Sequence, residues 1–258
     1  MLAVVFGLQN NMPKVSILMP TYNGAKYIAG AIESVLVQSY KDWELLIIVD
    51  GSSDNTVEIV NEYVAGDSRI KLIINDVNLR LPKTLNKGLA LAHGKFIARI
   101  DDDDKWVCVD KLERQINFLE DNIDYGLVGT DFIIVKDEGE TTFKTKKTDI
   151  EIRNVILSYN PFCHSSIVFK NDQSHNFNYN ENLVYTEDWD LWLRIGQYYK
   201  MANLDFSGVR YLLRNGMSKK NTKFRQIKYH ARIIKKYFTK YPHGLVAIMK
   251  LINYAIFY

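Results

Sequence analysis

The chain has little cysteine and no long hydrophobic run. Its 258 residues include two cysteines, Cys108 and Cys163, too few for a disulfide framework and without metal-ligand spacing, which suits a reducing compartment. The apolar run at 245–258 is shorter than the roughly 20 residues that a transmembrane helix needs. The apolar start, residues 1–8, has no basic region and no small-residue cleavage site, so we expect no signal peptide.

Two nucleotide-binding signatures are also absent. No Gly-x-Gly-x-x-Gly follows the first predicted strand, which argues against a dinucleotide-binding fingerprint, and no Gly-Lys-Ser/Thr phosphate loop occurs. A bound nucleotide must therefore be held in another way. The chain also has no long Pro/Gly/Ser linker and no internal repeat, and its 47% apolar and 24% charged residues are typical of a globular protein.

Acidic residues are missing from the C-terminal part. Of 33 Lys/Arg and 30 Asp/Glu in the chain, twelve basic residues and no acidic residue lie at 206–258. A basic tail of this kind commonly meets an anionic surface. Nucleic acid is not expected, because no aromatic and basic residues interleave as they do in known binding modules.

The apolar pattern alternates strands and helices in the first half. Predicted strands and helices alternate over 15–19, 25–37, 44–49, 54–65, 70–74, 82–92 and 96–100. This order predicts an α/β fold, with a doubly wound, mostly parallel sheet and helices on both faces. The later predicted elements are a helix at 109–120, strands at 126–135 and 141–144, a helix at 149–157, a strand at 166–169 and a helix from 187.

The C-terminal segment is predicted to be helical. From Lys223 apolar residues recur at spacings of three and four, with Lys/Arg on the other faces. Two interpretations stay open: a helix folded back on the core, and a helix lying on an anionic membrane face. We expect three parts: an extension at 1–13, a catalytic domain at 14–218 and a basic and apolar helical tail at 219–258.

Four consecutive aspartates, Asp101 to Asp104, follow the apolar run 96–100. Adjacent carboxylates repel one another, so they are tolerated when fully solvated or when a cation gathers them. They fall at the carboxyl end of a predicted buried strand, where open α/β sheets bind ligands. Carboxylates that leave open positions on Mg²⁺ or Mn²⁺ are the usual means of holding a diphosphate. We therefore expect a divalent metal here.

Acidic residues stand at two further points. Asp50 ends the second strand, and Glu187 and Asp188 open a late helix. Asp50 suits a hydrogen bond from a nucleotide base, and Asp188 suits removal of a proton from an acceptor hydroxyl. The alternative for Glu187 and Asp188 is a charge pair that favours the helix dipole.

At these residues the chain resembles the family 2 glycosyltransferases, which have a GT-A fold. The likeness runs from about Lys14 to Ser218 in the family's order. The segments that carry it are 15–23, 48–56, 85–89, 101–104, 126–129 and 187–194.

The resemblance implies a set of site residues. The donor nucleotide-sugar would contact Pro20, Thr21, Tyr22, Asp50, Asp101, Asp102 and Asp103. Asp101 and Asp103 would form the Asp-x-Asp pair that binds the metal. Asp188 would be the catalytic base, with Glu187 as its partner.

Three further residues are candidate contacts to the acceptor or substrate: Asp104, His164 and Trp189. A core or loop histidine is the alternative for His164. The helical spacing favours core packing for Trp192, whereas Trp189 suits stacking on a sugar.

The chain departs from the family pattern at three places. Val49 replaces the first of two aspartates that usually precede the Gly-Ser turn, and a proline usual after the Asp-x-Asp pair is missing near 106–109. Arg80 stands where the family often has glycine; it is either a phosphate contact or simply an exposed arginine.

The implied enzyme is an inverting, metal-dependent transferase. It would move a hexosyl or N-acetylhexosaminyl group from a nucleoside-diphosphate donor, expected to be a UDP-sugar, to a hydroxyl of a growing polysaccharide or lipid-linked oligosaccharide. The expected location is the cytoplasm, at the inner face of the cell membrane. One alternative is a sugar nucleotidyltransferase, but residues 20–24 do not supply its Gly-rich basic loop. The other is a non-catalytic nucleotide-sugar binding protein, against which the retained Asp101, Asp103 and Asp188 argue.

Overall fold

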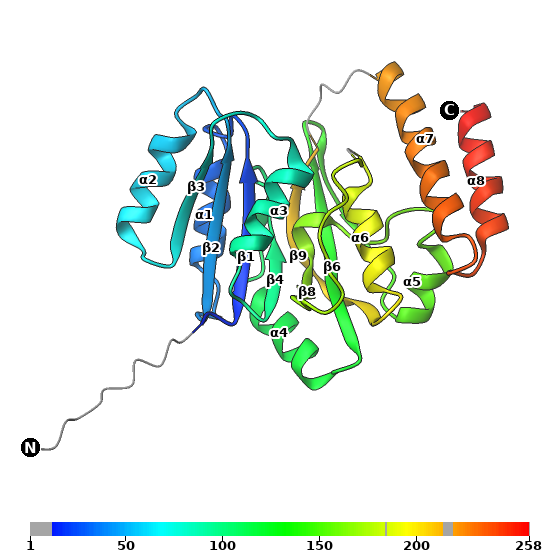
Figure 1. Ribbon diagram of the computed structural model, residues 1–258, viewed down its shortest axis with the longest axis horizontal. Helices are drawn as coiled ribbons and strands as arrows, with labels where there is room; N and C mark the ends of the chain where they lie inside the picture. Colours follow the sequence, from blue (N-terminus) through cyan, green and yellow to red (C-terminus); the bar gives the residue numbers. More distant parts are fainter. Residues whose placement is uncertain (1–11, 184, 214–218, 258) are drawn as a thin grey trace, which may run out of the picture.

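The computed structural model describes residues 12–183, 185–213 and 219–257 (Figure 1), so most of the predicted 1–13 extension lies outside the described residues. The strands are β1 (Val15–Thr21), β2 (Trp43–Asp50), β3 (Ile70–Asn75), β4 (Phe96–Arg99), β5 (Lys105–Trp106), β6 (Tyr125–Lys136), β7 (Gly139–Phe143), β8 (Val168–Lys170) and β9 (Lys200–Leu212). The helices are α1 (Ile28–Leu36), α2 (Thr56–Gly66), α3 (Leu81–Leu91), α4 (Lys111–Asp121), α5 (Asp149–Val155), α6 (Glu187–Ile195), α7 (Lys219–Tyr237) and α8 (Gly244–Phe257), with a short 3-10 turn at His164–Ser166.

The strands form one mixed sheet in the order β3-β2-β1-β4-β8-β6-β9-β5, with β7 paired to β6. Strands β1 to β4 are parallel to one another, as are β6 and β9. The predicted α/β fold with a mostly parallel sheet is confirmed. Because β2 and β4 lie on opposite sides of β1, the strand order reverses at β1, and the carboxyl ends of β1 and β4 mark the place where such sheets bind ligands.

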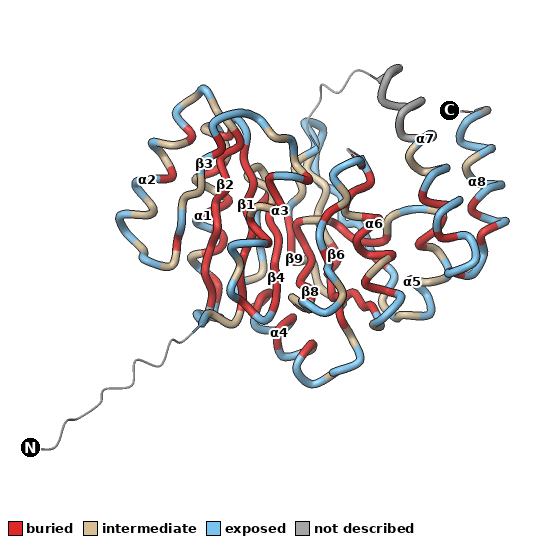
Figure 2. Tube along the Cα trace, viewed as in Figure 1, coloured by how far each residue is buried: buried red, intermediate tan, exposed pale blue. Residues whose placement is uncertain are grey.

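Alternation along β1 shows how both faces of the sheet are covered. Ile17 and Met19 pack in a core with residues of α1 and α4, whereas Leu18 packs in the core that includes residues of α3 and α6. Successive side chains of a strand point to opposite faces. Both cores are apolar, so β1, β2 and β4 are buried along their length (Figure 2), whereas β3 at the sheet edge is only partly buried.

The second half of the sheet contains a strand that the sequence patterns did not predict. Strand β9 pairs with β6 in parallel and with β5 antiparallel. Its apolar alternation is weak, and its pairing with β6 is broken by register shifts between Thr130 and Phe132. This strand brings Tyr211 and Leu212 to the carboxyl edge of β1 and β4.

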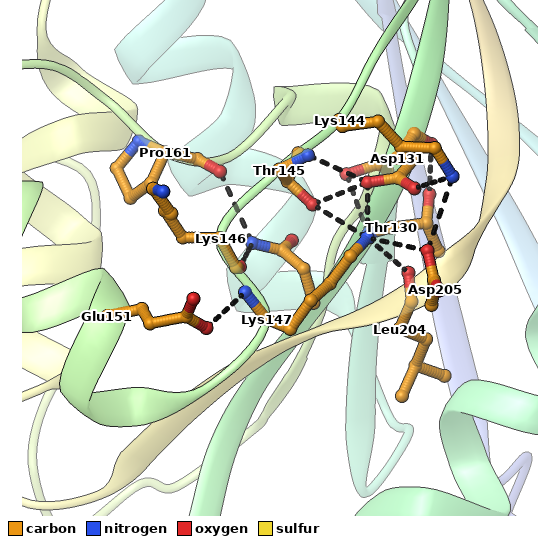
Figure 3. A network of polar contacts seen from close by, with 12 residues as sticks. Thr130, Asp131, Lys144, Thr145, Lys146, Lys147, Glu151, Pro161, Leu204 and Asp205 are labelled. Carbon is orange, nitrogen blue, oxygen red and sulfur yellow. Dashed lines mark hydrogen bonds and ion pairs between the residues drawn. The ribbon is translucent and has the colours of Figure 1, made fainter.

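A polar network fastens β6 to the segment that precedes α5 (Figure 3). Asp131 on β6 is fully buried and accepts hydrogen bonds from the backbone N–H and the hydroxyl of Thr145, both at 2.8 Å. Lys144 and Lys147 donate to the same carboxylate. A buried carboxylate needs such partners, and the network fixes the course of the chain toward α5.

Helix α7 and the turn after it pack on α6, and α8 packs against α7 (Figure 1). The Tyr237 hydroxyl donates to Asp190 Oδ1 at 2.8 Å, and the Tyr241 hydroxyl donates to Leu193 O at 2.8 Å. One side of this helix pair therefore folds back on the core, as one of the two interpretations expected. The other side of α8 is exposed, with Leu245 at 70% and Met249 at 69%. None of the helices in the described part of the chain combines the length and apolar character that a membrane-spanning helix requires.

Candidate active site

A cavity of about 410 Å³ opens at the carboxyl ends of β1, β2 and β4. Every residue predicted to contact the donor lines it: Pro20, Thr21, Tyr22, Asp50, Asp101, Asp102 and Asp103. The rest of the lining comes from α3, the loop before it and the end of β9. Of these residues the sequence analysis had considered only Arg80. The predicted donor residues, far apart in the chain, are thus brought together.

Asp50 closes one end of the cavity and is only 4% exposed. Its Oδ1 accepts hydrogen bonds from Asn75 Nδ2 at 2.8 Å and from the backbone N–H of Leu79 at 2.9 Å. Its Oδ2 accepts one from the backbone N–H of Arg80 at 3.0 Å. Gly51 follows with φ +70, and a Cβ there would come within 2.6 Å of Asn78 N. Asp50 therefore positions the loop that forms one wall of the cavity.

Arg80 lines the cavity in a backbone conformation that side chains disfavour. Its φ is 72 and its ψ is 155, a region that glycine occupies freely and other residues rarely adopt. This explains physically why the resembling family often has glycine at this position. In this protein Arg80 keeps the strained backbone conformation, and its side chain lines the cavity.

Thr21 and Asp102 connect β1 with the loop after β4. The Thr21 hydroxyl donates to Asp102 Oδ2 at 2.5 Å. A Cβ at Gly24 would lie 2.2 Å from the same oxygen, so glycine allows this approach. Tyr22 is 52% exposed at the mouth of the cavity, where its ring is accessible for stacking on a planar group.

Arg99, which the sequence reasoning did not single out, lies beneath the aspartates. Its side chain is fully buried, and Nη2 donates to Asp101 Oδ1 at 2.5 Å. Burial opposes ionisation of Asp101, but the charge and hydrogen bond of Arg99 outweigh it and lower the pKa of this carboxyl. The sequence feature that could have pointed to Arg99 is that it is a single arginine in an otherwise apolar strand.

The four aspartates do not share one environment. Asp104 is 1% exposed and does not line the cavity. Its Oδ2 accepts from the Ser165 hydroxyl and its Oδ1 from the backbone N–H of Leu212. Burial and the charge of Asp101 hold the pKa of Asp104 well above its usual range. The structure therefore makes Asp104 a tie to the end of β9, rather than the predicted contact to the acceptor.

Glu187 and Asp188 open α6 as a carboxylate pair with unequal pKa values. Burial, followed by the charge of Asp188, raises the pKa of Glu187 to about 8. Burial raises the pKa of Asp188 to about 6, against the lowering effect of hydrogen bonds from Trp189 N at 2.6 Å and Asn160 Nδ2 at 2.7 Å. Glu187 therefore has the higher pKa of the pair, and Asp188 is the member that ionises first as the pH rises. Two carboxyl groups with pKa values set apart are typical of acid–base chemistry.

Asp188 is not among the residues that line the cavity, but two charges at this end of the sheet reach it. The charges of Arg99 and Asp101 both act on its pKa. The structure therefore brings the predicted base into the electrostatic field of the aspartates, from a helix about ninety residues further along the chain.

The remaining candidate contacts lie outside the cavity. His164 Nε2 and the Tyr179 hydroxyl are hydrogen-bonded at 2.9 Å, and burial, helped by Arg99, holds the pKa of His164 well below its usual range. The imidazole is therefore neutral. Trp189 is 7% exposed and donates from Nε1 to Ile156 O at 2.6 Å. It faces a different cavity from the one that Asp50 and Asp101 line.

Residues 16–188 match the model of glycosyl transferase family 2. The chain belongs to this family. It is 39% identical over 189 residues to the putative glycosyltransferase EpsE of Bacillus subtilis, covering 72% of this chain and 67% of that protein. It is 30% identical over 239 residues, covering 92% of each, to WfaP of Escherichia coli, described as UDP-Glc:alpha-D-GlcNAc-diphosphoundecaprenol beta-1,3-glucosyltransferase.

The structure of this family 2 glycosyltransferase also resembles solved structures. It superposes on Staphylococcus aureus TarS, residues 1–349 in complex with UDP-GlcNAc, with a TM-score of 0.71. The match covers 94% of this chain and 71% of that one at 20% sequence identity. At this identity the likeness shows the shared fold, which is GT-A.

Proposed function

We propose that this glycosyltransferase moves a sugar from a UDP-sugar to a hydroxyl of a lipid-linked saccharide or growing polysaccharide, with inversion at the anomeric carbon. The observation that carries the proposal is the cavity lined by Asp50, Asp101 and Asp103, together with a carboxylate pair, Glu187 and Asp188, on whose pKa values the charge of Asp101 acts. The cavity would hold the nucleotide, and the pair would supply the base.

The donor would bind with its base toward Asp50 and its diphosphate toward the aspartates. Asp50 Oδ2 accepts one hydrogen bond from its own chain and retains capacity for another. Tyr22 and Thr21 line the same cavity, and Arg80, which also lines it, adds a positive charge. A hydrogen-bond acceptor, an aromatic ring and a positive charge in one cavity suit a nucleoside diphosphate, which combines a planar base with negative charge.

A divalent cation fits the side chains present. Asp101 and Asp103 line the cavity. Among the described residues, no three or more His, Cys, Asp or Glu side chains are grouped so that they could bind a metal ion by themselves. Mg²⁺ and Mn²⁺ are commonly held by one or two carboxylates together with substrate phosphates. Asp103 and Asp101 would hold the ion, which would supply positive charge to the leaving diphosphate.

Asp188 would act as the general base. It would take the proton of the acceptor hydroxyl while the oxygen forms a bond to the anomeric carbon of the donor. The bond from that carbon to the phosphate oxygen breaks, and UDP leaves with the electron pair. A single displacement from the face opposite the leaving group inverts the configuration.

The acceptor and location are inferred from a relative and from the C-terminal helices. The name of WfaP gives it a diphosphoundecaprenol-linked GlcNAc as acceptor. In this chain, α8 exposes Leu245 and Met249, and segment 206–258 is rich in lysine and arginine. An apolar strip within a basic segment suits the anionic inner face of a cell membrane. We accordingly treat 14–218 as the catalytic domain and 219–258 as its membrane-facing tail.

The test is calorimetric titration of UDP and GDP, with and without Mn²⁺, on the wild type and on Asp103→Ala. We expect UDP to bind in a metal-dependent manner that Asp103→Ala abolishes, and UDP-sugars then to yield a product of inverted configuration. Binding of neither nucleotide would overturn the donor assignment. Binding of UDP-sugar without transfer or slow hydrolysis would instead favour the non-catalytic binder.

A further inference from the structure

A second cavity, of about 390 Å³, lies between the start of α6 and the two C-terminal helices. Its walls include Thr186 and Trp189 at α6, His230 on α7, and Lys250 and Tyr254 on α8. The residues assigned to the donor do not take part in it. Figure 1 shows the positions of α6, α7 and α8 in the fold.

Asp188 is adjacent in the chain to residues of the second cavity. Thr186 and Trp189, which flank the Glu187–Asp188 pair, both line that cavity. Neither lines the donor cavity. A group bound in the second cavity would therefore lie at the start of α6, where Asp188 stands.

The wall of this cavity nearest α6 is aromatic and fixed in place. Trp189 donates from Nε1 to Ile156 O at 2.6 Å, and His230 Nε2 donates to Leu157 O at 2.9 Å. The two ring centroids are 4.6 Å apart. Burial lowers the pKa of His230, so this ring is neutral. Rigid aromatic rings are suited to pack against the C–H faces of a pyranose.

Thr186 offers an unpaired hydroxyl at the cavity. Its side chain is 6% exposed, and Oγ1 is buried with no hydrogen-bond partner among the described residues. Leaving such a group unpaired costs free energy, and most buried polar groups in proteins are satisfied. A ligand hydroxyl would satisfy it.

Lys250 supplies the positive charge. The lining of the cavity includes no acidic residue, and none of the ion pairs recorded among the described residues uses Lys250. An ammonium group at the rim of an aromatic cavity favours a ligand that joins a sugar to an anionic group.

We propose that this second cavity is the acceptor subsite and that it takes a glycosyl diphosphate. The sugar lies against Trp189 with a hydroxyl toward Asp188, and the diphosphate lies at Lys250. The inference rests on the proposed function, in which Asp188 is the base and the acceptor is a lipid-linked saccharide. It adds the place at which that acceptor binds and the residues that select it.

The test is direct binding of a probe, α-GlcNAc diphosphate carrying a short alkyl chain, measured by calorimetry with and without saturating UDP. The variants are Lys250→Ala and the nearly isosteric Thr186→Val, with Lys146→Ala as a control at an exposed lysine away from both cavities. We expect the probe Kd to rise about tenfold in Lys250→Ala and about fivefold in Thr186→Val. It should stay unchanged in Lys146→Ala.

Two shortened probes separate the contacts. Thr186→Val should weaken alkyl-linked GlcNAc but not alkyl diphosphate, and Lys250→Ala should do the reverse. Thermal unfolding confirms that each variant is folded, and Thr186→Val is expected to retain the wild-type Tm because it removes an unpaired group.

Two results would overturn the subsite. One is a wild type that does not bind the probe in either condition, and the other is a probe Kd that neither variant changes. The UDP titration is separate. Normal UDP binding together with either of these results rejects the subsite alone, whereas a wild type that fails to bind UDP rejects the proposed donor site.

Discussion

Arg99 donates to Asp101 from a position that solvent does not reach, with 2.5 Å between Nη2 and Oδ1. Its Nε and Nη1 have no hydrogen-bond partner among the described residues. A buried guanidinium with one bonded partner is costly. Its charge nevertheless acts on Asp101, Asp188 and Glu187 together, so one cation connects the donor aspartates with the carboxylate pair of α6.

Replacing Arg99 should move the acid limb of the pH profile. Arg99→Met removes a charge that lowers the pKa of Asp188, so the acid limb of kcat/KM should shift to higher pH. Arg99→Lys, which retains a charge, should shift it less. Because the ion pair is partly buried, Arg99→Met should also destabilise the fold by roughly 3 kcal/mol, measured by urea unfolding. Equal acid limbs in wild type and both variants would contradict the electrostatic role.

Asp188 and Glu187 should respond very differently to amide substitution. Asp188→Asn removes the base and should lower kcat by about 10²–10⁴-fold with UDP binding unchanged. Glu187→Gln mimics the protonated form that the raised pKa of Glu187 implies, so its loss should be less than about tenfold. Steady-state kinetics and UDP calorimetry on both variants provide the comparison. Similar losses in the two variants would count against the assignment of Asp188 as the ionised member.

The wild-type pH profile should show the titration of Asp188. Burial raises its pKa to about 6, and a general base acts only when deprotonated. The value of kcat/KM should therefore fall about tenfold per pH unit below that pKa, at a higher pH than for an ordinary aspartate. A flat profile from pH 7 down to pH 5 would speak against Asp188 as the base.

Arg80 combines backbone strain with a charge at the donor cavity, and two variants separate them. Arg80→Gly relieves the strain of φ 72 and should raise the free energy of unfolding by about 1 kcal/mol. Arg80→Ala keeps the strain and should not. Both lose the guanidinium and should weaken UDP binding several-fold. Unchanged UDP affinity in both variants would show that Arg80 is simply an exposed arginine.

Asp131 should stabilise the fold in a pH-dependent way. Burial opposes its ionisation, but hydrogen bonds from Lys147, Thr145 and Lys144 lower its pKa from 3.8 to about 2. Because the pKa is lower in the folded state, the stabilisation is fully present above about pH 4 and is lost as the pH falls toward 2. Asp131→Asn should cost roughly 2–4 kcal/mol at pH 7, and its difference from wild type should shrink between pH 4 and pH 2 in thermal melts. A difference that is constant with pH would contradict this.

The exposed face of α8 should bind anionic vesicles. The double change Leu245→Ser and Met249→Ser removes two apolar side chains that are 70% and 69% exposed, and should lower partitioning into phosphatidylglycerol-rich vesicles at least about tenfold. Ile123→Ser, at a residue that is 81% exposed outside the C-terminal helices, is the matched control. Vesicle sedimentation measures the binding. Equal binding of all three proteins, or no wild-type preference for anionic over neutral vesicles, would refute the membrane surface.

The first half of the fold could be predicted because its signals are local. Parallel strands buried on both faces give continuous apolar runs, such as Leu45 to Val49 in β2. Strand β9 escaped prediction because its place depends on a partner, β6, that lies about seventy residues earlier, and because register shifts interrupt the pairing. Nothing within residues 200–212 specifies that partner.

The sequence by itself determined the family, the alternation of strands and helices, and the types of side chain at the site. It could not show that Asp104 is buried whereas Asp103 lines the cavity, because the exposure of neighbouring carboxylates depends on how the chain folds around them. Nor could it show that Arg99 lies beneath Asp101, or that Asp188 loses solvent and gains a raised pKa. Those properties come from burial and from charges brought close by distant segments, and only the tertiary structure decides them.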